Sequence, residues 1–252
     1  MFKFCFLLIL NSSMVFSQNY ELVWSEEFES TTLDSEIWNI EKGYGKNYEE
    51  QLYTEASENL KVENGKLVIT AIKSENKNEY SSARINTLNK QHFKYGKIEM
   101  RAKLPKGNGT WPAIWMLGKN HLTKGYPYCG EIDIMEHVGK SPNEVHGAVH
   151  YPIENEELIS SSDQITLKAL KDEYHIYSIE WDRKEITYFL DGKEYFNFDV
   201  SEANRCFKKN VFRKPFYLII NLALGGKWAG EIDNSIFPAQ FYVDYIKYYK
   251  LQ

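Results

Sequence analysis

Short runs of apolar, aromatic and β-branched residues recur along this 252-residue chain and constrain its fold more than any other feature. Residues 60–73 contain two such runs separated by an Asn-Gly pair, and residues 185–200 contain two separated by an Asp-Gly pair. Both segments are predicted to be β-hairpins, because these pairs suit the tightest hairpin turns. No segment beyond the N-terminal region has the period of a long helix. The pattern predicts an all-β fold, either a sandwich or a barrel.

Three further segments are predicted to be strands. Residues 94–105 and 241–251 alternate between apolar and polar, which is typical of a strand with one buried face. Residues 216–224, FYLIINLAL, form a continuous apolar run and are predicted to be a central strand covered on both faces. The acidic, serine-rich residues 154–164 are predicted to be the least ordered loop, and residues 166–172 could form a short helix.

The first residues have the pattern of a secretory signal. Lys3 precedes an apolar run over residues 4–10, and small polar residues follow it. The run is far shorter than the ~20 apolar residues of a membrane span, so no membrane span is expected. We expect cleavage after Ser17, which makes residues 1–17 a signal peptide and 18–252 one domain that is secreted to the periplasm or beyond. The alternative for the first residues is a buried N-terminal strand.

The charge balance and the cysteines exclude some function classes. The formal net charge is −5 and no basic stripe is present, which argues against nucleic acid as a partner. Two cysteines lie beyond the predicted signal, Cys129 and Cys206, and their spacing does not show whether they pair. Two separate thiols are the simpler interpretation. No Cys/His spacing suggests zinc.

The segment GEIDIMEHVG places three carboxylates, Glu131, Asp133 and Glu136, within six positions. Side chains of a strand alternate between its faces, so Glu131 and Asp133 share a face and Glu136 points the other way. One extra residue at Ile134-Met135, a β-bulge, would return Glu136 to the first face. All three acids would then point the same way.

Two carboxylates on one face suit hydrolysis of a glycosidic bond. One protonates the leaving oxygen, and the other attacks the anomeric carbon or activates water, at a separation of ~5–5.5 Å in retaining enzymes and ~6.5–9.5 Å in inverting ones. A flat strand from Glu131 to Glu136 would span roughly 15 Å, so the sheet must be concave to bring the two acids together. By spacing alone, a solvated strand without function remains the simpler explanation.

Several landmarks in order along the chain resemble glycoside hydrolase family 16, and most closely its laminarinase (endo-1,3-β-glucanase) branch. GEIDIMEHVG resembles the active-site signature, and Met135 corresponds to the extra residue of that branch. The resemblance covers about residues 20–252. The other matching segments are NYEEQLYT (47–54), SSARINT (81–87), GTWPAIWML (109–117), HGAVHY (146–151), NLALGGKWAG (221–230) and FYVDYIKYY (241–249).

The resemblance implies that residues 18–252 form a jelly-roll β-sandwich of two antiparallel sheets with a concave substrate cleft. It implies a retaining endo-β-1,3-glucanase, with mixed-linkage β-1,3-1,4-glucans as second candidate substrates and no cofactor required for catalysis. Glu131 would be the nucleophile, Asp133 its helper and Glu136 the acid/base. The expected partner is a β-glucan polysaccharide, and the chain is expected to be a monomer.

The resemblance also implies which residues contact the sugar. By sequence alone they have ordinary explanations as core tryptophans, a surface cation, a loop residue and a structural histidine. Trp228, which follows a Gly-Gly pair, is expected to shape the far end of the groove. The implied substrate-binding residues are Asn47, Arg84, Trp111, Trp115 and His150.

Many members of this family hold a structural calcium ion away from the catalytic residues. Calcium prefers hard oxygen ligands, including backbone carbonyls and carboxylates. The matching positions here are Glu27, Gly65 and Asp244. The alternative is that these are ordinary turn and strand residues.

Other functions stay open within this fold. A hydrolase of agar, porphyran or carrageenan would share the carboxylates, but sulfated galactans would be expected to require more basic residues in the cleft. A transglycosylase would use the same retaining chemistry with a sugar in place of water. A non-catalytic glucan-binding protein would be expected to have lost the acids, whereas this chain keeps all three.

Overall fold

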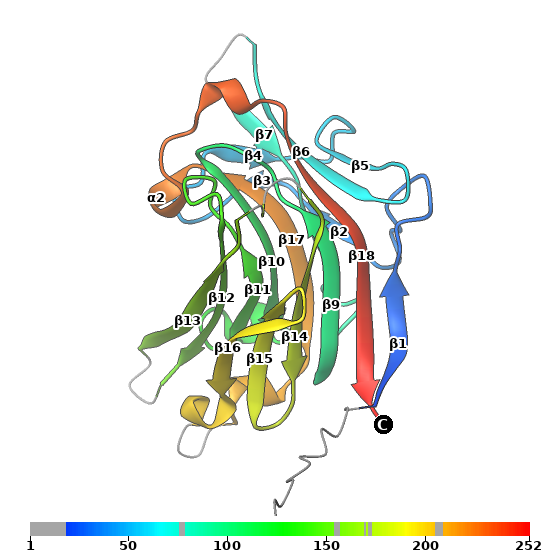
Figure 1. Ribbon diagram of the computed structural model, residues 1–252, viewed down its shortest axis with the longest axis vertical. Coiled ribbons are helices and arrows are strands. Elements are labelled where there is room, and N and C mark those ends of the chain that lie inside the picture. Colours follow the sequence, from blue (N-terminus) through cyan, green and yellow to red (C-terminus); the bar gives the residue numbers. More distant parts are fainter. Residues whose placement is uncertain (1–18, 76–78, 154–156, 169, 171–172, 205–208) are drawn as a thin grey trace, which may run out of the picture.

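The structure is a computed structural model that describes residues 19–75, 79–153, 157–168, 170, 173–204 and 209–252. The predicted signal peptide and Cys206 lie outside the described residues. Within the described part, the chain forms a sandwich of two sheets (Figure 1). The predicted all-β, two-sheet sandwich is therefore confirmed.

The larger sheet has eleven strands among the described residues. These are β1 (Tyr20–Glu26), β3 (Gly43–Tyr44), β4 (Gln51–Tyr53), β5 (Leu60–Val62), β6 (Leu67–Lys73), β7 (Tyr80–Ser82), β9 (Gly96–Lys103), β14 (His175–Trp181), β15 (Glu185–Leu190), β16 (Lys193–Asp199) and β18 (Ala239–Leu251). The order is β16-β15-β14-β9-β18-β6-β7-β4-β3, with β1 paired to β18 and β5 paired to β6. Only β4 and β7 pair in parallel among the described strands.

The smaller sheet has seven strands in the same described ranges. These are β2 (Asn39–Glu41), β8 (Arg84–Asn86), β10 (Thr110–Gly118), β11 (Glu131–Glu136), β12 (Glu144–Pro152), β13 (Leu158–Thr166) and β17 (Phe216–Leu224). The order is β13-β12-β11-β10-β17-β8-β2, and all of these pairs are antiparallel. Figure 1 shows β10, β11 and β17 as curved neighbouring ribbons.

Helices are short throughout the described residues. They are α1 (His121–Lys124), α2 (Gly226–Ala229) and the 3-10 turns η1 (Val200–Ala203), η2 (Val211–Arg213) and η3 (Asn234–Ile236). In the described part of the chain, no helix is both long and apolar enough to cross a membrane.

Both predicted hairpins are confirmed. The first joins β5 to β6 and turns at Asn64 and Gly65, whose φ angles are 54° and 68°. The second joins β15 to β16 and turns at Asp191 and Gly192, with φ of 51° and 77°. Two consecutive positive φ angles are costly for most residues, so Asn-Gly and Asp-Gly select this turn and fix the strand register.

The continuous apolar run is a covered strand, β17, as predicted. All nine of its residues are buried. Its even-numbered residues enter the core between the sheets, while Tyr217 and Ile219 pack on the opposite face with Leu117 and Cys129. Among the described residues Cys129 has no disulfide partner. Because β17 lies between β10 and β8 and is covered on both faces, it anchors the strands on either side of it.

Replacing Ile220 in the middle of β17 with alanine tests this anchoring. Ile220 has no exposed surface, so the change removes buried methyl groups and leaves a cavity. We expect the free energy of unfolding to fall by about 2–5 kcal/mol, measured by chemical denaturation. The exposed Lys193→Ala variant should change it by less than about 0.5 kcal/mol. Equal stabilities for the two variants would contradict the central role of β17.

The remaining strand predictions have mixed outcomes. Residues 94–105 and 241–251 are strands, mainly β9 and β18. The prediction of a loop over 154–164 is wrong for residues 158–164, because Leu158–Thr166 forms β13 and pairs with β12 along its full length, while residues 154–156 lie outside the described residues. β13 is an exposed edge strand, so it needs no apolar pattern and is held by backbone hydrogen bonds to its neighbour. The possible helix over 166–172 falls partly outside the described residues.

Candidate active site

The predicted β-bulge in β11 is confirmed. Asp133 and Met135 pair with consecutive residues of β10, so Ile134 between them is the extra residue. The register against β12 also shifts between Asp133 and Glu136. Ile134 and Met135 are both buried in the core, and Glu136 returns to the face that carries Asp133. We call this surface of the smaller sheet the acid face.

The three carboxyl groups on the acid face are electrostatically coupled. Burial raises the pKa of Glu131 well above its usual value, and the charge of Asp133 raises it further. Burial is the main cause that raises the pKa of Asp133, and the charge of Glu136 adds to the rise. The hydrogen bond between Asp133 and Glu131 lowers the pKa of Asp133 and so opposes the rise. Burial also raises the pKa of Glu136. The cluster therefore retains protons at a pH where isolated carboxyl groups would be ionised.

Glu136 has a second polar contact that sets its position. Trp111 Nε1 donates a hydrogen bond of 3.0 Å to Glu136 Oε1. This bond favours the charged form and so opposes the rise in the pKa of Glu136. Burial raises the pKa of this carboxyl group and the hydrogen-bond donor lowers it. A group with such a balance is suited both to donate a proton and to accept one.

His150 lies beside the acids, as expected. Its Nε2 is 3.1 Å from Asp133 Oδ2, and its Nδ1 is 2.6 Å from the hydroxyl of Ser160 on β13. Among the described residues, Glu131, Asp133 and His150 each offer one atom of a kind that can bind a metal ion, and these three atoms lie within 4.8 Å of one another. The hydrogen bond between Glu131 and Asp133 and the contact of His150 with Asp133 already account for their proximity.

Aromatic side chains stand at one end of the acid face. Trp111 and Trp228 meet edge to face with ring centroids 5.1 Å apart, and His146 meets Trp228 at 5.1 Å. Trp228 is carried by α2. Trp228 therefore packs against the tryptophan whose indole donates to Glu136. Its expected role at the far end of the groove stays a prediction. Partly exposed aromatic faces of this kind can stack on sugar rings.

Arg84 and Trp115 lie together on the same face. The guanidinium carbon of Arg84 is 4.8 Å from the Trp115 ring centroid, and Arg84 Nε is 3.1 Å from Glu41 Oε2. Trp115 Nε1 donates a 2.7 Å hydrogen bond to Asn221 Oδ1. The hydrogen bond to Asn221 therefore fixes the edge of the Trp115 ring, and the Arg84 guanidinium lies over its face.

Sequence reasoning did not identify a buried polar chain behind Trp115. Asn221 Nδ2 donates to Tyr53 Oη at 3.2 Å, and Tyr53 donates to Glu49 Oε2 at 2.9 Å. Gln51 Nε2 donates to the same oxygen. A usable signal was present, since Asn221 interrupts an apolar run and residues 49, 51 and 53 alternate onto one face.

Asn47 is exposed in the turn between β3 and β4 and has a φ of 63°. A Cβ atom on Gly226 would lie only 3.0 Å from the Asn47 carbonyl oxygen, so the turn packs closely against α2. Asn47 therefore borders the segment that carries Trp228.

The three predicted calcium positions lie in the larger sheet and its turns, and two of them already contact cations. Asp244 Oδ2 is 2.5 Å from Arg101 Nη1, and Asp244 Oδ1 is 3.6 Å from Lys66 Nζ. Glu27 Oε1 is 3.5 Å from Lys247 Nζ. Gly65 is exposed in the first hairpin turn. Calcium binding at Asp244 would require Arg101 and Lys66 to turn away from it.

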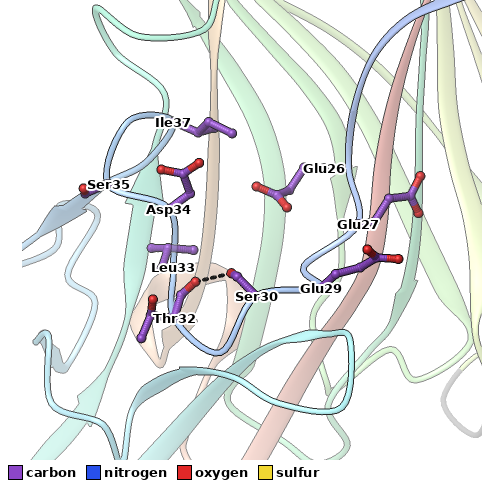
Figure 2. Close-up of a pocket in the computed structure, with 9 residues that line it drawn as sticks. All are labelled: Glu26, Glu27, Glu29, Ser30, Thr32, Leu33, Asp34, Ser35 and Ile37. Carbon is purple, nitrogen blue, oxygen red and sulfur yellow. Dashed lines mark hydrogen bonds between the residues drawn. The ribbon is translucent and has the colours of Figure 1, made fainter.

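A separate surface pocket of about 490 Å³ adjoins Glu27 (Figure 2). Its lining includes Glu26, Glu29 and Asp34. Glu26 already accepts hydrogen bonds from the backbone of Phe28 and from the indole of Trp38. Calcium binding at this side of the molecule stays a prediction, which calorimetric titration of the protein with Ca²⁺ tests.

Comparison with known proteins agrees with the family resemblance of the sequence. The sequence model of the family described as "Glycosyl hydrolases family 16" matches residues 47–247. A beta-glucanase from Rhodothermus marinus is 42% identical over 247 residues, which cover 92% of this chain and 86% of that protein.

Two solved structures are also similar. The laminarinase from Flavobacterium sp. UMI-01 has a TM-score of 0.82 and 42% identity over 91% of this chain and 100% of its own. The catalytic domain of an endo-1,3-beta-glucanase (laminarinase) from Thermotoga petrophila RKU-1 has a TM-score of 0.83 and 41% identity over 94% and 100%. This likeness confirms the expected jelly-roll form of the sandwich. The chain belongs to glycosyl hydrolase family 16.

Proposed function

We propose that this chain is a retaining endo-β-1,3-glucanase that hydrolyses laminarin-like glucans, with mixed-linkage β-1,3-1,4-glucans as further substrates. The observation that carries the proposal is the bulged strand β11, which holds Glu131, Asp133 and Glu136 on one face of a family 16 fold. Relatives named beta-glucanase and laminarinase support the choice of glucan.

The proposed reaction is a double displacement. Glu131 attacks the anomeric carbon while Glu136 gives its proton to the departing glycosidic oxygen, which leaves a covalent glycosyl–enzyme. Glu136, now a base, takes a proton from water, and that water releases the sugar with its original configuration. The raised pKa of Glu136 supports its role as an acid, because the group keeps its proton to a higher pH than an ordinary carboxyl group.

Asp133 is proposed to assist Glu131. It is 2% exposed and shares a hydrogen bond with the nucleophile, so it fixes the orientation of that carboxylate. A proton shared between the two also allows Glu131 to carry the negative charge that attack requires. Asp133 does not itself contact the reacting carbon in this proposal.

The proposed sugar contacts come from both sides of the acids. Trp111 and Trp115 offer partly exposed indole faces for stacking on glucose rings. Arg84 and His150 are proposed to donate hydrogen bonds to hydroxyl groups, and Asn47 to meet the chain farther along near Trp228. None of these contacts requires a cofactor.

Product analysis on laminarin, barley mixed-linkage glucan and agarose tests the function. A mixture of short oligosaccharides from laminarin, with agarose intact, is the expected result. Cleavage of a galactan with laminarin intact would keep the mechanism and overturn the substrate. Tight binding of laminarin without cleavage would support the alternative of a glucan-binding protein, and new longer chains would indicate transglycosylation.

Arg84→Lys tests the proposed sugar contact of this residue. Lysine keeps the charge but loses the planar fork that lies over Trp115 and reaches Glu41. We expect KM for laminarin to rise by about tenfold with kcat changed less than about threefold, because uniform binding is lost. Arg183→Lys, in a turn of the other sheet, is the control and should behave as the wild type. A fall in kcat with KM unchanged would contradict this role.

We also propose that the chain is exported and acts as a monomer. The N-terminal pattern supports cleavage after Ser17. Mass spectrometry of the exported protein would give the cleavage site directly, and light scattering would give the oligomeric state. A mature protein that still begins at residue 1 would overturn the proposed signal peptide.

A further inference from the structure

We propose that Ser160 is a positioning residue that holds His150 with its proton on Nε2, directed at Asp133. The proposal rests on the proposed function only for its kinetic consequence. Ser160 lies directly opposite His150 in the β12–β13 register, and its hydroxyl oxygen is 2.6 Å from His150 Nδ1. The residue belongs to the edge strand that the sequence did not predict.

The partners of the ring indicate where its proton lies. Asp133 Oδ2 is buried and has no hydrogen-bond partner among the described residues, and His150 Nε2 lies 3.1 Å from it without forming a hydrogen bond of good geometry. When the Asp133–Glu131 pair carries negative charge, a lone pair on Nε2 would face a carboxylate oxygen at that distance, which is unfavourable, whereas an N–H there is attracted to it. The proton of a neutral ring therefore belongs on Nε2.

The other ring nitrogen then acts as an acceptor. With the proton on Nε2, Nδ1 of the neutral imidazole carries a lone pair. The Ser160 hydroxyl can donate to that lone pair, which fixes both the tautomer and the ring orientation. Without this hydroxyl, the ring can place its proton on Nδ1 or rotate away from Asp133.

This arrangement divides the two oxygens of Asp133 between different partners. Oδ2 faces His150 Nε2, while the carboxyl group shares a hydrogen bond with Glu131. An N–H on Nε2 at that distance stabilises negative charge on the Asp133–Glu131 pair. Ser160 thereby favours an ionised nucleophile although it does not touch the substrate.

Removal of Ser160 leaves the charges of the other titratable groups unchanged. Ser160 is neutral, so any effect of its loss on the pH profile comes from the ring and not from an added or deleted charge. The titratable groups on the strands of His150 and its neighbours, or that interact with the acids, are Glu131, Asp133 and Glu136 on β11, Tyr126 before β11, His146 on β12, Asp163 on β13, Tyr188 on β15 and Tyr195 on β16.

Ser162 provides a matched control. It lies two residues along β13 from Ser160, so it shares the same face, and it is similarly exposed. Its partner in β12 is Ala148, which has no polar side chain. Ser160→Ala and Ser162→Ala therefore remove the same hydroxyl group from the same exposed strand edge, and both variants should fold.

The direct test is the ¹⁵N NMR signature of the His150 ring, which does not depend on any substrate. The wild type and Ser162→Ala should show an N–H at Nε2 and an acceptor-type Nδ1. Ser160→Ala should shift toward the opposite tautomer or toward exchange between the two, and Ser160→Thr should restore the original signature. An unchanged tautomer in Ser160→Ala would overturn the proposal.

The kinetic test uses laminarin, or whichever polysaccharide the wild type cleaves. Ser160→Ala should lower kcat/KM by roughly three- to tenfold, as expected for loss of one hydrogen bond. The acid limb of the profile should move to higher pH by roughly 0.5 unit, because the nucleophile holds its proton longer. Profiles that coincide with that of Ser162→Ala would overturn this consequence. Failure of the wild type on every polysaccharide would refute the proposed function but leave the NMR test intact.

Discussion

Replacing Glu131 with glutamine is expected to lower kcat/KM on laminarin by about 10⁴- to 10⁶-fold, because the covalent glycosyl–enzyme cannot form without the nucleophile. The amide keeps the shape of the carboxylate but cannot attack the anomeric carbon. Binding of laminarin oligosaccharides, measured by calorimetry, should stay within about threefold of the wild type because the sugar contacts are intact. Reducing-end assays and product chromatography give the rate.

Chemical rescue identifies the role of Glu131. Glu131→Ala leaves space for a small anion, so azide should attack the anomeric carbon once and give a glycosyl azide of inverted configuration. Glu194→Gln, an exposed carboxyl group on β16, is the control and should retain full activity. More than a tenth of wild-type activity in Glu131→Gln would contradict its assignment as the nucleophile.

Replacing Glu136 with glutamine is expected to lower kcat/KM on laminarin by about 10²- to 10⁴-fold, because the departing oxygen no longer receives a proton. Activity requires protonated Glu136, whose pKa burial raises, so the wild-type rate should fall as pH rises through that value. The variant should lose this basic limb. The pH dependence of kcat/KM from pH 4 to 9 measures it.

The leaving group separates Glu136 from Glu131. An aryl glycoside whose phenol leaves without protonation should form the covalent intermediate in Glu136→Gln at close to the wild-type rate. Azide added to Glu136→Ala should give a glycosyl azide of retained configuration, opposite to the product from the Glu131 variant. Glycosyl azides of the same configuration from Glu136→Ala and Glu131→Ala would contradict the assignment of separate roles to the two residues.

The local pattern was sufficient to predict elements whose residues have few alternatives. Asn64-Gly65 and Asp191-Gly192 tolerate two positive φ angles, so the hairpins follow from local sterics. The continuous apolar run of β17 could only be stable where both faces are covered. The bulge followed from the spacing of the carboxylates together with the family resemblance, and the register confirms it.

The edge strand β13 shows where local pattern failed. Leu158–Thr166 is polar and largely exposed, so it carries no apolar period. Its stability comes from the ladder with β12, which is a contact with a separate segment of the chain. The sequence therefore predicts a loop at Ser160, and only the pairing of β13 with β12 brings its hydroxyl to His150.

The all-β class, the hairpin turns and the covered strand follow from the sequence alone, because each depends on a residue and its near neighbours. The three acids are singled out by the family resemblance, which draws on segments along the chain. Which distant groups meet depends on the tertiary structure: Trp111 with Glu136, Asn221 with Trp115, and Ser160 with His150. Protonation of the acids was also decided there, since burial and neighbouring charges dominate their pKa values. These contacts, the burial and the neighbouring charges all arise from packing between strands that are distant in the sequence. A local sequence pattern does not encode that packing.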